Sequence, residues 1–131
     1  MATITPTLTI ASTDAFANQP INLSATAGIV VGAPMADIST VVATTTGANS
    51  IIVPAGTAVT YLYVKHTGTT DGTTGTAHFV DIEDTANVAM ARLAAGEFAF
   101  FPANKAGGST GIQLQTTSGN ILCEYMYFTK A

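Results

Sequence analysis

The sequence has few charged residues. Only 9% of its 131 residues are Asp, Glu, Lys or Arg, whereas soluble domains average about 25%. Eight acids outnumber four cations, and the formal net charge is −4. Because nucleic-acid binding needs a basic patch, this balance argues against direct contact with DNA or RNA. A surface poor in Lys and Glu and rich in threonine instead suits burial in an assembly, and the alternative is a threonine-rich soluble sandwich.

Tryptophan is absent, and the chain has one cysteine and two histidines. Cys123 cannot form an internal disulfide, which fits a reducing compartment and a buried, small side chain. No apolar run of about 18 residues or more exists, so we expect no membrane-spanning helix. The N-terminus lacks the basic start and apolar core of a signal peptide. We therefore expect the chain to stay in the cytoplasm unless an assembly carries it out.

Short segments of alternating apolar and polar residues, separated by turn residues, make up most of the chain. The clearest lie within 59–101, where Tyr61 and Tyr63 would share one strand face. The segments 112–116 and 121–128 are expected to form a closing hairpin. About eight strands with turns every 8–12 residues predict an all-β fold. We expect a single antiparallel β-sandwich, jelly-roll-like, with an extended N-terminal arm.

Residues 1–20 are expected to form this arm or an edge strand, and residues 21–131 the sandwich domain. Apolar residues alternate with threonine in the arm, while Pro6 cannot donate to a sheet ladder. Such an arm could add a strand to the sheet edge of a neighbouring subunit. The loops 67–75 and 104–111 are further candidate contacts. The candidate assembly interface therefore comprises Ile4, Leu8, Ile10, Thr69, Asp71, Thr73, Asn104 and Lys105.

Two groups of residues could hold a metal ion. His66 and His78 lie near the two ends of one expected hairpin, but a closed zinc site takes four ligands. Asp81, Glu83 and Asp84 could bind calcium at a strand end, yet they lack the spacing of a known calcium loop. We favour the simpler interpretation, two strand histidines and a solvated turn, and expect no cofactor.

Other residues suggest chemistry only weakly. Cys123 lies in the middle of a strand, in an apolar context, and without a neighbouring base it is not an activated nucleophile. Glu97 and Glu124 would form a glycosidase pair only if their carboxylates lay about 5–10 Å apart. Three glycines match no phosphate-binding loop, and four tyrosines could form a sugar platform or belong to the core. These residues are Gly28, Gly32 and Gly56, and Tyr61, Tyr63, Tyr125 and Tyr127.

Four short runs in the second half form a recognisable set. They are Tyr-Leu-Tyr-Val-Lys-His-Thr-Gly at 61–68, Arg-Leu-Ala-Ala-Gly-Glu-Phe at 92–98, Phe-Pro at 101–102 and Glu-Tyr-Met-Tyr-Phe at 124–128. Together they resemble small virion proteins of tailed bacteriophages, over about residues 50–128. His66 stands where that pattern has asparagine, and Ala95 where it has proline.

The resemblance implies a non-enzymatic virion structural protein, most specifically a capsid decoration (cement) protein. Such proteins form jelly rolls or β-tulips, often as trimers, and they bridge capsomers and stabilise the phage head. The implied partners are the major capsid protein and sister subunits in a homotrimer, with no nucleic acid, membrane or small-molecule substrate. The implied location is the capsid surface of the virion, after synthesis in the host cytoplasm.

Two alternatives belong to other classes. The first is a carbohydrate- or receptor-binding module, or a fibre or tail structural β-sandwich, which would present exposed aromatic residues in a concave patch. The second is an enzyme of cupin or lyase type on a jelly roll. Such an enzyme needs a metal cluster, which two histidines do not supply.

Overall fold

A computed structural model describes residues 2–16, 19–34, 38–57, 60–103 and 109–131. These residues form antiparallel sheets and one short 3₁₀ turn, η1 (Gly47–Asn49). None of their helical turns is long and apolar enough to cross a bilayer. The expected all-β class is confirmed, although the described residues form twelve strands and not about eight.

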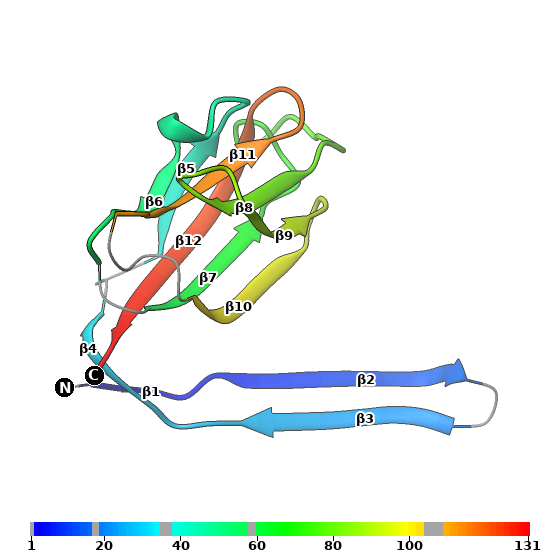
Figure 1. The fold of residues 1–131 in the computed structure, drawn as a ribbon. Helices are drawn as coiled ribbons and strands as arrows, with labels where there is room; N and C mark the ends of the chain where they lie inside the picture. Colours follow the sequence, from blue (N-terminus) through cyan, green and yellow to red (C-terminus); the bar gives the residue numbers. More distant parts are fainter. Residues whose placement is uncertain (1, 17–18, 35–37, 58–59, 104–108) are drawn as a thin grey trace.

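The larger sheet of the body is built around the C-terminal strand (Figure 1). Its strands, in the order in which they pair, are β1 (Ala2–Ile4), β4 (Ile29–Pro34), β12 (Ile121–Lys130), β7 (Thr60–His66) and β10 (Phe98–Ala103). β5 (Ser39–Ala43) lies on the same side of β12 as β4, next to residues 121–125. β12 therefore joins the N-terminal strands to the centre of the body.

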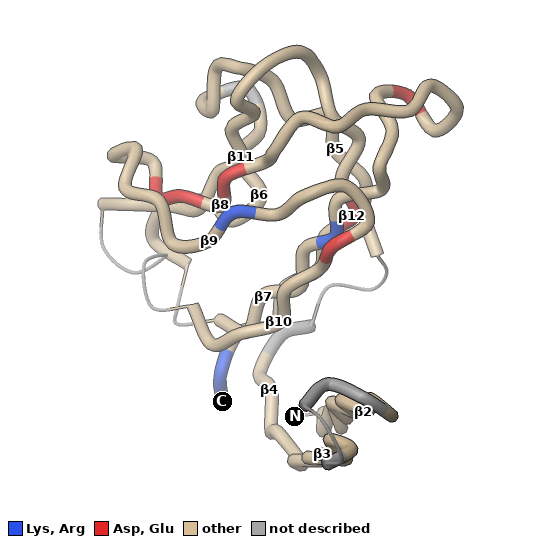
Figure 2. Tube along the Cα trace, turned by 90° about the vertical axis from the view of Figure 1, so that its right-hand side faces the viewer, with Lys and Arg blue, Asp and Glu red and all other residues tan. Residues whose placement is uncertain are grey.

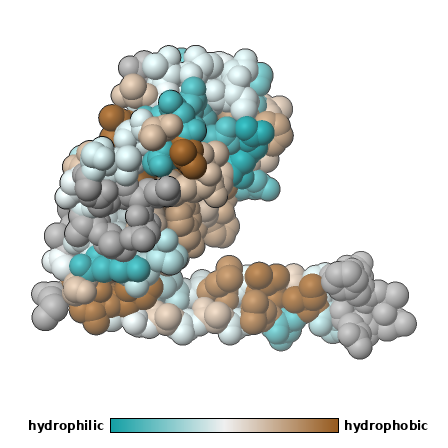
Figure 3. Space-filling model, in the orientation of Figure 1, coloured by the Kyte–Doolittle hydropathy of each residue, from teal (hydrophilic) through white to brown (hydrophobic). Residues whose placement is uncertain are grey.

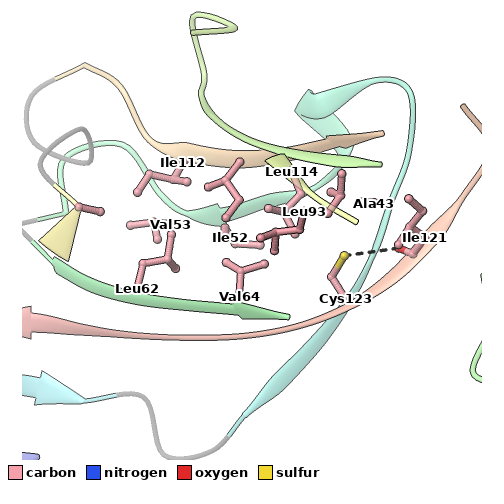
Figure 4. Close-up of a cluster of buried hydrophobic side chains, with 13 residues drawn as sticks. Ala43, Ile52, Val53, Leu62, Val64, Leu93, Ile112, Leu114, Ile121 and Cys123 are labelled. Atoms are coloured by element: carbon pink, nitrogen blue, oxygen red, sulfur yellow. Dashed lines mark hydrogen bonds between the residues drawn. The ribbon is translucent and has the colours of Figure 1, made fainter. Parts of the chain in front are cut away.

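A second sheet covers one face of the first. Its order is β6 (Ile51–Val53), β11 (Ile112–Thr116), β8 (Val80–Asp84) and β9 (Ala89–Leu93). Alternation in β7 turns Leu62 and Val64 inward, where they face Ile112 and Leu114 of the second sheet (Figure 4). The hydrophobic core therefore lies between the two sheets and leaves the other face of β7 outside it.

The expected closing hairpin is not formed. β11 pairs with β6 and β8, whereas β12 lies in the other sheet beside β7. The strands around the 67–75 loop, β7 and β8, are likewise divided between the sheets. Apolar alternation determines which residues face the core, but it does not determine which strand becomes the neighbour. β8 and β9 of the body do form a hairpin, since they follow one another in the chain and pair within one sheet.

The N-terminal arm is a hairpin that stands away from the body (Figure 1). It consists of β2 (Thr7–Phe16) and β3 (Gln19–Thr26), which form their own two-stranded sheet. Residues 21–26, which we assigned to the sandwich domain, belong to this hairpin, so the arm extends to Thr26. Residues 5–6 and 27–28 interrupt both strands at the same level, where the Ala27 amide donates to the Pro6 carbonyl at 3.3 Å.

Thr60, the first residue of β7, offers a test of the core. Its side chain is fully buried, and its Oγ1 has no hydrogen-bond partner among the described residues. Because valine has the same shape without the hydroxyl, Thr60→Val should raise the free energy of unfolding by about 1 kcal/mol. Urea denaturation measures this change. Thr60→Ser, which keeps the hydroxyl and loses the methyl, should destabilise, and a lower midpoint for Thr60→Val than for wild type would contradict the assignment.

Candidate assembly surface

The two sides of the arm differ in chemistry. Strand pairing places Leu8 opposite Ala25, Ile10 opposite Leu23 and Ser12 opposite Ile21. Directly opposed residues share a face of a two-stranded sheet. One side of the arm therefore presents Leu8, Ile10, Ile21, Leu23 and Ala25, which we call the apolar side. The other side presents Thr7, Thr9, Ala11, Asn22, Ser24 and Thr26.

The apolar side of the arm is exposed. Leu8 is 50% exposed, Ile10 45% and Leu23 48%, and Figure 3 shows hydrophobic side chains along the arm with nothing packed over them. An isolated two-stranded hairpin is only marginally stable in water, because it buries too little apolar surface. A hairpin with this pattern gains stability when another surface covers its apolar side.

The body has a second exposed apolar surface, on the outer side of β7 and β10. It consists of Tyr61, Tyr63, Phe98 and Phe100, which we call the aromatic face. The Tyr61 and Phe100 rings stack with centroids 6.2 Å apart, and those of Tyr63 and Phe98 lie 6.5 Å apart. Phe98 is 61% exposed. These contacts hold the rings as a platform, in which Phe98 and Phe100 are exposed and the two tyrosines are half-buried.

An open cleft of about 850 Å³ lies between the base of the arm and the aromatic face. Leu8, Ala25 and Ile29 line it from the arm side, and all four rings of the aromatic face line it from the body. Ile10, Ile21 and Leu23 do not belong to its lining, since they lie farther along the arm. The cleft therefore brings together only the base of the arm and the body of the same chain.

Charge is nearly absent from both surfaces. None of the described residues that line the cleft has a charged or carboxamide side chain. Figure 2 shows the coloured Lys, Arg, Asp and Glu residues on the body, and the sequence of β2 contains one acidic residue, Asp14. At the margin of the aromatic face, Lys65 and Glu124 are 4.0 Å apart, and Lys130 Nζ lies 4.9 Å from the Tyr61 ring centroid. Contact with these surfaces should therefore depend on apolar burial more than on ion pairs.

Comparisons of the chain with models of protein families, with curated proteins and with solved structures found no match. The function must therefore be argued from the residues themselves. The structure provides two apolar surfaces that are exposed and poor in charge, the apolar side of the arm and the aromatic face.

The predicted interface residues do not form one surface. Leu8 and Ile10 lie on the apolar side of the arm, while Ile4 lies in β1, beside β4. Thr69, Asp71 and Thr73 lie in the loop at the end of the body remote from the arm (Figures 1 and 2). The remaining two, Asn104 and Lys105, lie outside the described residues. Sequence reasoning missed Ile21 and Leu23, although their alternation with Asn22 and Ser24 was visible, because that strand was placed in the sandwich.

The loop at 67–75 is fixed by hydrogen bonds within the chain. The Leu122 amide donates to the Thr69 carbonyl at 2.8 Å, and Thr67 Oγ1 donates to the Leu122 carbonyl at 2.7 Å. Asp71 Oδ1 accepts from the amides of Thr73 and Thr74, and both hydroxyls donate to the same carboxylate. These bonds hold the pKa of Asp71 well below its usual range. The loop therefore does not need a neighbouring subunit to order it.

Asp71→Ala should loosen this loop. The substitution removes the acceptor of two amides and two hydroxyls, so we expect faster amide hydrogen exchange at Thr73 and Thr74 at neutral pH. Since the folded-state pKa is depressed, wild-type loop order should persist at neutral pH and be lost only as pH falls through that lowered pKa. Asp71→Asn, which keeps one oxygen acceptor, is the matched control. Unchanged exchange in Asp71→Ala would contradict this role.

The two histidines do not converge as metal ligands. His66 is fully buried, its Nδ1 accepts from the Gly68 amide at 2.9 Å, and its Nε2 donates to the His78 carbonyl at 2.9 Å. Both ring nitrogens are therefore engaged with backbone, as in a neutral Nε2–H ring. His66 fastens the base of the 67–75 loop. The described residues contain no group of three or more His, Cys, Asp or Glu that could hold a metal ion.

The three acids proposed for calcium each have a partner inside the chain. Asp81 forms a bidentate ion pair with Arg92, at 2.7 and 2.8 Å. Glu83 is buried and accepts from Gln113 Nε2 at 2.8 Å. Asp84, also buried, accepts from the amides of Ala86 and Val88 in the β8–β9 turn. The expectation of a solvated turn is therefore wrong for Glu83 and Asp84, which are buried structural residues.

The remaining candidates also have structural partners. Burial raises the pKa of the Cys123 thiol to about 12, so little thiolate forms at neutral pH. Glu97 Oε2 accepts from the Ala94 amide in the β9–β10 turn. Glu124 faces Lys65 across β12 and β7. The tyrosines divide: Tyr125 and Tyr127 pack against the core, whereas Tyr61 and Tyr63 belong to the aromatic face, which corrects the core interpretation for those two.

Proposed function

We propose that this protein is a non-enzymatic virion structural subunit, most specifically a capsid decoration (cement) protein with a jelly-roll-like β-sandwich body. In this role it bridges capsomers on the capsid surface and stabilises the phage head, with the major capsid protein and sister subunits as partners. The resemblance of residues 50–128 to small virion proteins supports the proposal.

The single observation that supports it most is the uncovered apolar side of the arm. A projecting hairpin with Leu8, Ile10 and Leu23 about half exposed gains its stability by contact with something outside its own body. The scarcity of charge along the arm and on the aromatic face fits permanent burial, because charged residues are depleted from the centres of interfaces. The side chains that we considered for catalysis, Cys123, Glu97 and Glu124, have structural roles in the body.

Attachment to capsids tests the proposal. Capsids assembled without this protein would be incubated with the wild-type chain or with a variant in which Asn-Gly replaces residues 7–26. Pro6 and Ala27 are already hydrogen-bonded across the ribbon, so a two-residue turn can join them. We expect a cooperatively melting body and occupancy reduced at least about tenfold, or 1.4 kcal/mol of binding free energy. Occupancy equal to that of wild type would overturn the proposed role of the arm.

A second candidate, a carbohydrate- or receptor-binding module, is favoured by one observation. Aromatic rings line an open cleft, as sugar-binding platforms do. Sugar recognition also needs polar side chains placed around the ring, and the described lining supplies hydroxyls but neither carboxylates nor amides. A glycan array separates the two: binding that is lost in Phe98→Ala would favour the module, and a blank array favours the structural subunit.

A further inference from the structure

We propose that the apolar side of the arm docks on the aromatic face of a second copy of this chain, so that neighbouring copies exchange arms. The proposal deepens the proposed function, on which it rests, by naming a sister subunit as the partner of the arm. It also gives the exposed aromatic face a role that the fold of one chain does not.

The two surfaces match in shape and chemistry. The apolar side of the arm is a two-stranded ribbon of aliphatic side chains, and the aromatic face is a two-stranded platform of rings. Two sheets pack face to face about 10 Å apart, with aliphatic and aromatic side chains interdigitating. Lys65 is paired with Glu124 beside the aromatic face, whereas the Lys130 ammonium lies 4.9 Å from the Tyr61 ring centroid, so docking over Tyr61 has to keep or displace one charge.

Within one chain, the apolar side of the arm does not cover the aromatic face along its whole length. β1 pairs with β4 and β4 with β12, which ties the base of the arm to the body. As a result, Leu8 and Ala25 line the cleft with the aromatic face, while Ile10, Ile21 and Leu23 project beyond it. The outer part of the arm can therefore reach another copy, and the aromatic face, with Phe98 61% exposed, remains open to receive one.

The surface area that a docked arm would bury favours a mutual exchange of arms over a single contact. Ten residues of extended strand span about 30 Å, and a ribbon of two strands is about 10 Å wide. One arm docked over its whole length would therefore bury at most on the order of 600 Å² in total, below the 1,200 Å² or more of stable specific interfaces. Two reciprocal contacts between the same two copies reach about 1,200 Å², whereas each interface of a three-copy ring holds one docked arm and the ring is closed by three such contacts. Exchange between identical chains increases the number of docked arms and thus the total buried area, because every copy has both surfaces.

Site-specific cross-linking between two distinguishable copies tests the inference. One chain would carry Leu23→Cys, and a second chain, lengthened by a tag so that its mass differs, would carry Phe98→Cys. Cys123 can remain in both, since it is buried and its thiolate is scarce. After treatment with a short bis-maleimide, we expect a mixed product at least about ten times more abundant than with a tagged Val88→Cys control. Val88 is 51% exposed and lies in the β8–β9 turn, away from the aromatic face.

The outcomes are distinct. A mixed product that exceeds the control supports arm exchange. A mixed product no more abundant than the control would overturn it. So would a doubly substituted chain, Leu23→Cys with Phe98→Cys, that cross-links within one chain at all dilutions, because the arm would then cover its own body.

Paired substitutions in the arm provide the second measurement. Ile10→Asn with Leu23→Asn makes one directly opposed pair on the apolar side polar, and Thr9→Asn with Ser24→Asn changes the neighbouring pair on the other side. We expect the first to weaken self-association by about 100-fold, and the second to leave it within about threefold. Equal effects would overturn the proposal. If self-association is unaffected by either pair while capsid occupancy still needs the arm, this inference fails and the proposed function stands.

Discussion

Replacing Leu62 by alanine is expected to lower the free energy of unfolding by about 3 kcal/mol. Leu62 is fully buried at the centre of β7, between the two sheets (Figure 4). Its truncation removes buried apolar surface and leaves a cavity that the surrounding strands fill only partly, which typically costs 2–5 kcal/mol. Urea denaturation followed by circular dichroism measures the change.

The matched control is Phe98→Ala, on the other side of the same sheet. Phe98→Ala removes more atoms than Leu62→Ala, but the Phe98 side chain is 61% exposed. Its truncation should therefore change the free energy of unfolding by less than about 1 kcal/mol. The same variant should weaken self-association, because it removes part of the aromatic face. A loss of stability in Phe98→Ala equal to that in Leu62→Ala would show that the aromatic face belongs to the core, and would contradict its role as a contact surface.

Gly111→Ala is expected to destabilise the body by about 3 kcal/mol or more. A Cβ at this position would lie against the carbonyl oxygen of Val53, 2.9 Å from the amide nitrogen of Ala55 and 3.1 Å from the carbonyl carbon of Pro54. These are backbone atoms, so the strain must be relieved by moving β6 and not by rotating a side chain. The backbone of Gly111 also bonds Thr85 in both directions, with N–O distances of 3.1 and 3.2 Å.

Gly75→Ala is the control for this prediction. Nothing lies within 4 Å of a Cβ at Gly75, and its backbone conformation is open to any residue. We expect its unfolding midpoint to stay close to that of wild type or to rise slightly, since alanine restricts the unfolded chain. A Gly111→Ala protein as stable as Gly75→Ala would contradict the close approach of β6 at this point.

The sequence allowed most strands of the body to be predicted. Alternation in 60–66 placed Leu62 and Tyr63 on opposite faces of their strand, as the structure has them, but it did not decide which face is the core. The pairing of those strands was not predictable, since β11 and β12 are adjacent in the chain but lie in different sheets. The constraint on Gly111 was equally invisible, because it comes from residues 53–55, far away in the sequence.

The candidate surface was predictable only in part. The arm was expected from alternating Ile and Thr residues, and Leu8 and Ile10 were assigned to it correctly as exposed residues. Its second strand was expected but was assigned to the sandwich, because an amphipathic strand in an arm has the same pattern as an edge strand of a sandwich. The outward position of Tyr61 and Phe98 was hidden for a similar reason: both faces of these strands are apolar, and only the second sheet decides which one is the core.

The absolute mass of the purified wild-type chain, measured by light scattering over a concentration series, tests the central claim most directly. If the apolar side of the arm and the aromatic face are contact surfaces between copies, the mass should reach two or three times the chain mass of 13.3 kDa. Ile10→Asn with Leu23→Asn should return it to the mass of one chain. A wild-type mass of 13.3 kDa at every concentration would contradict the claim.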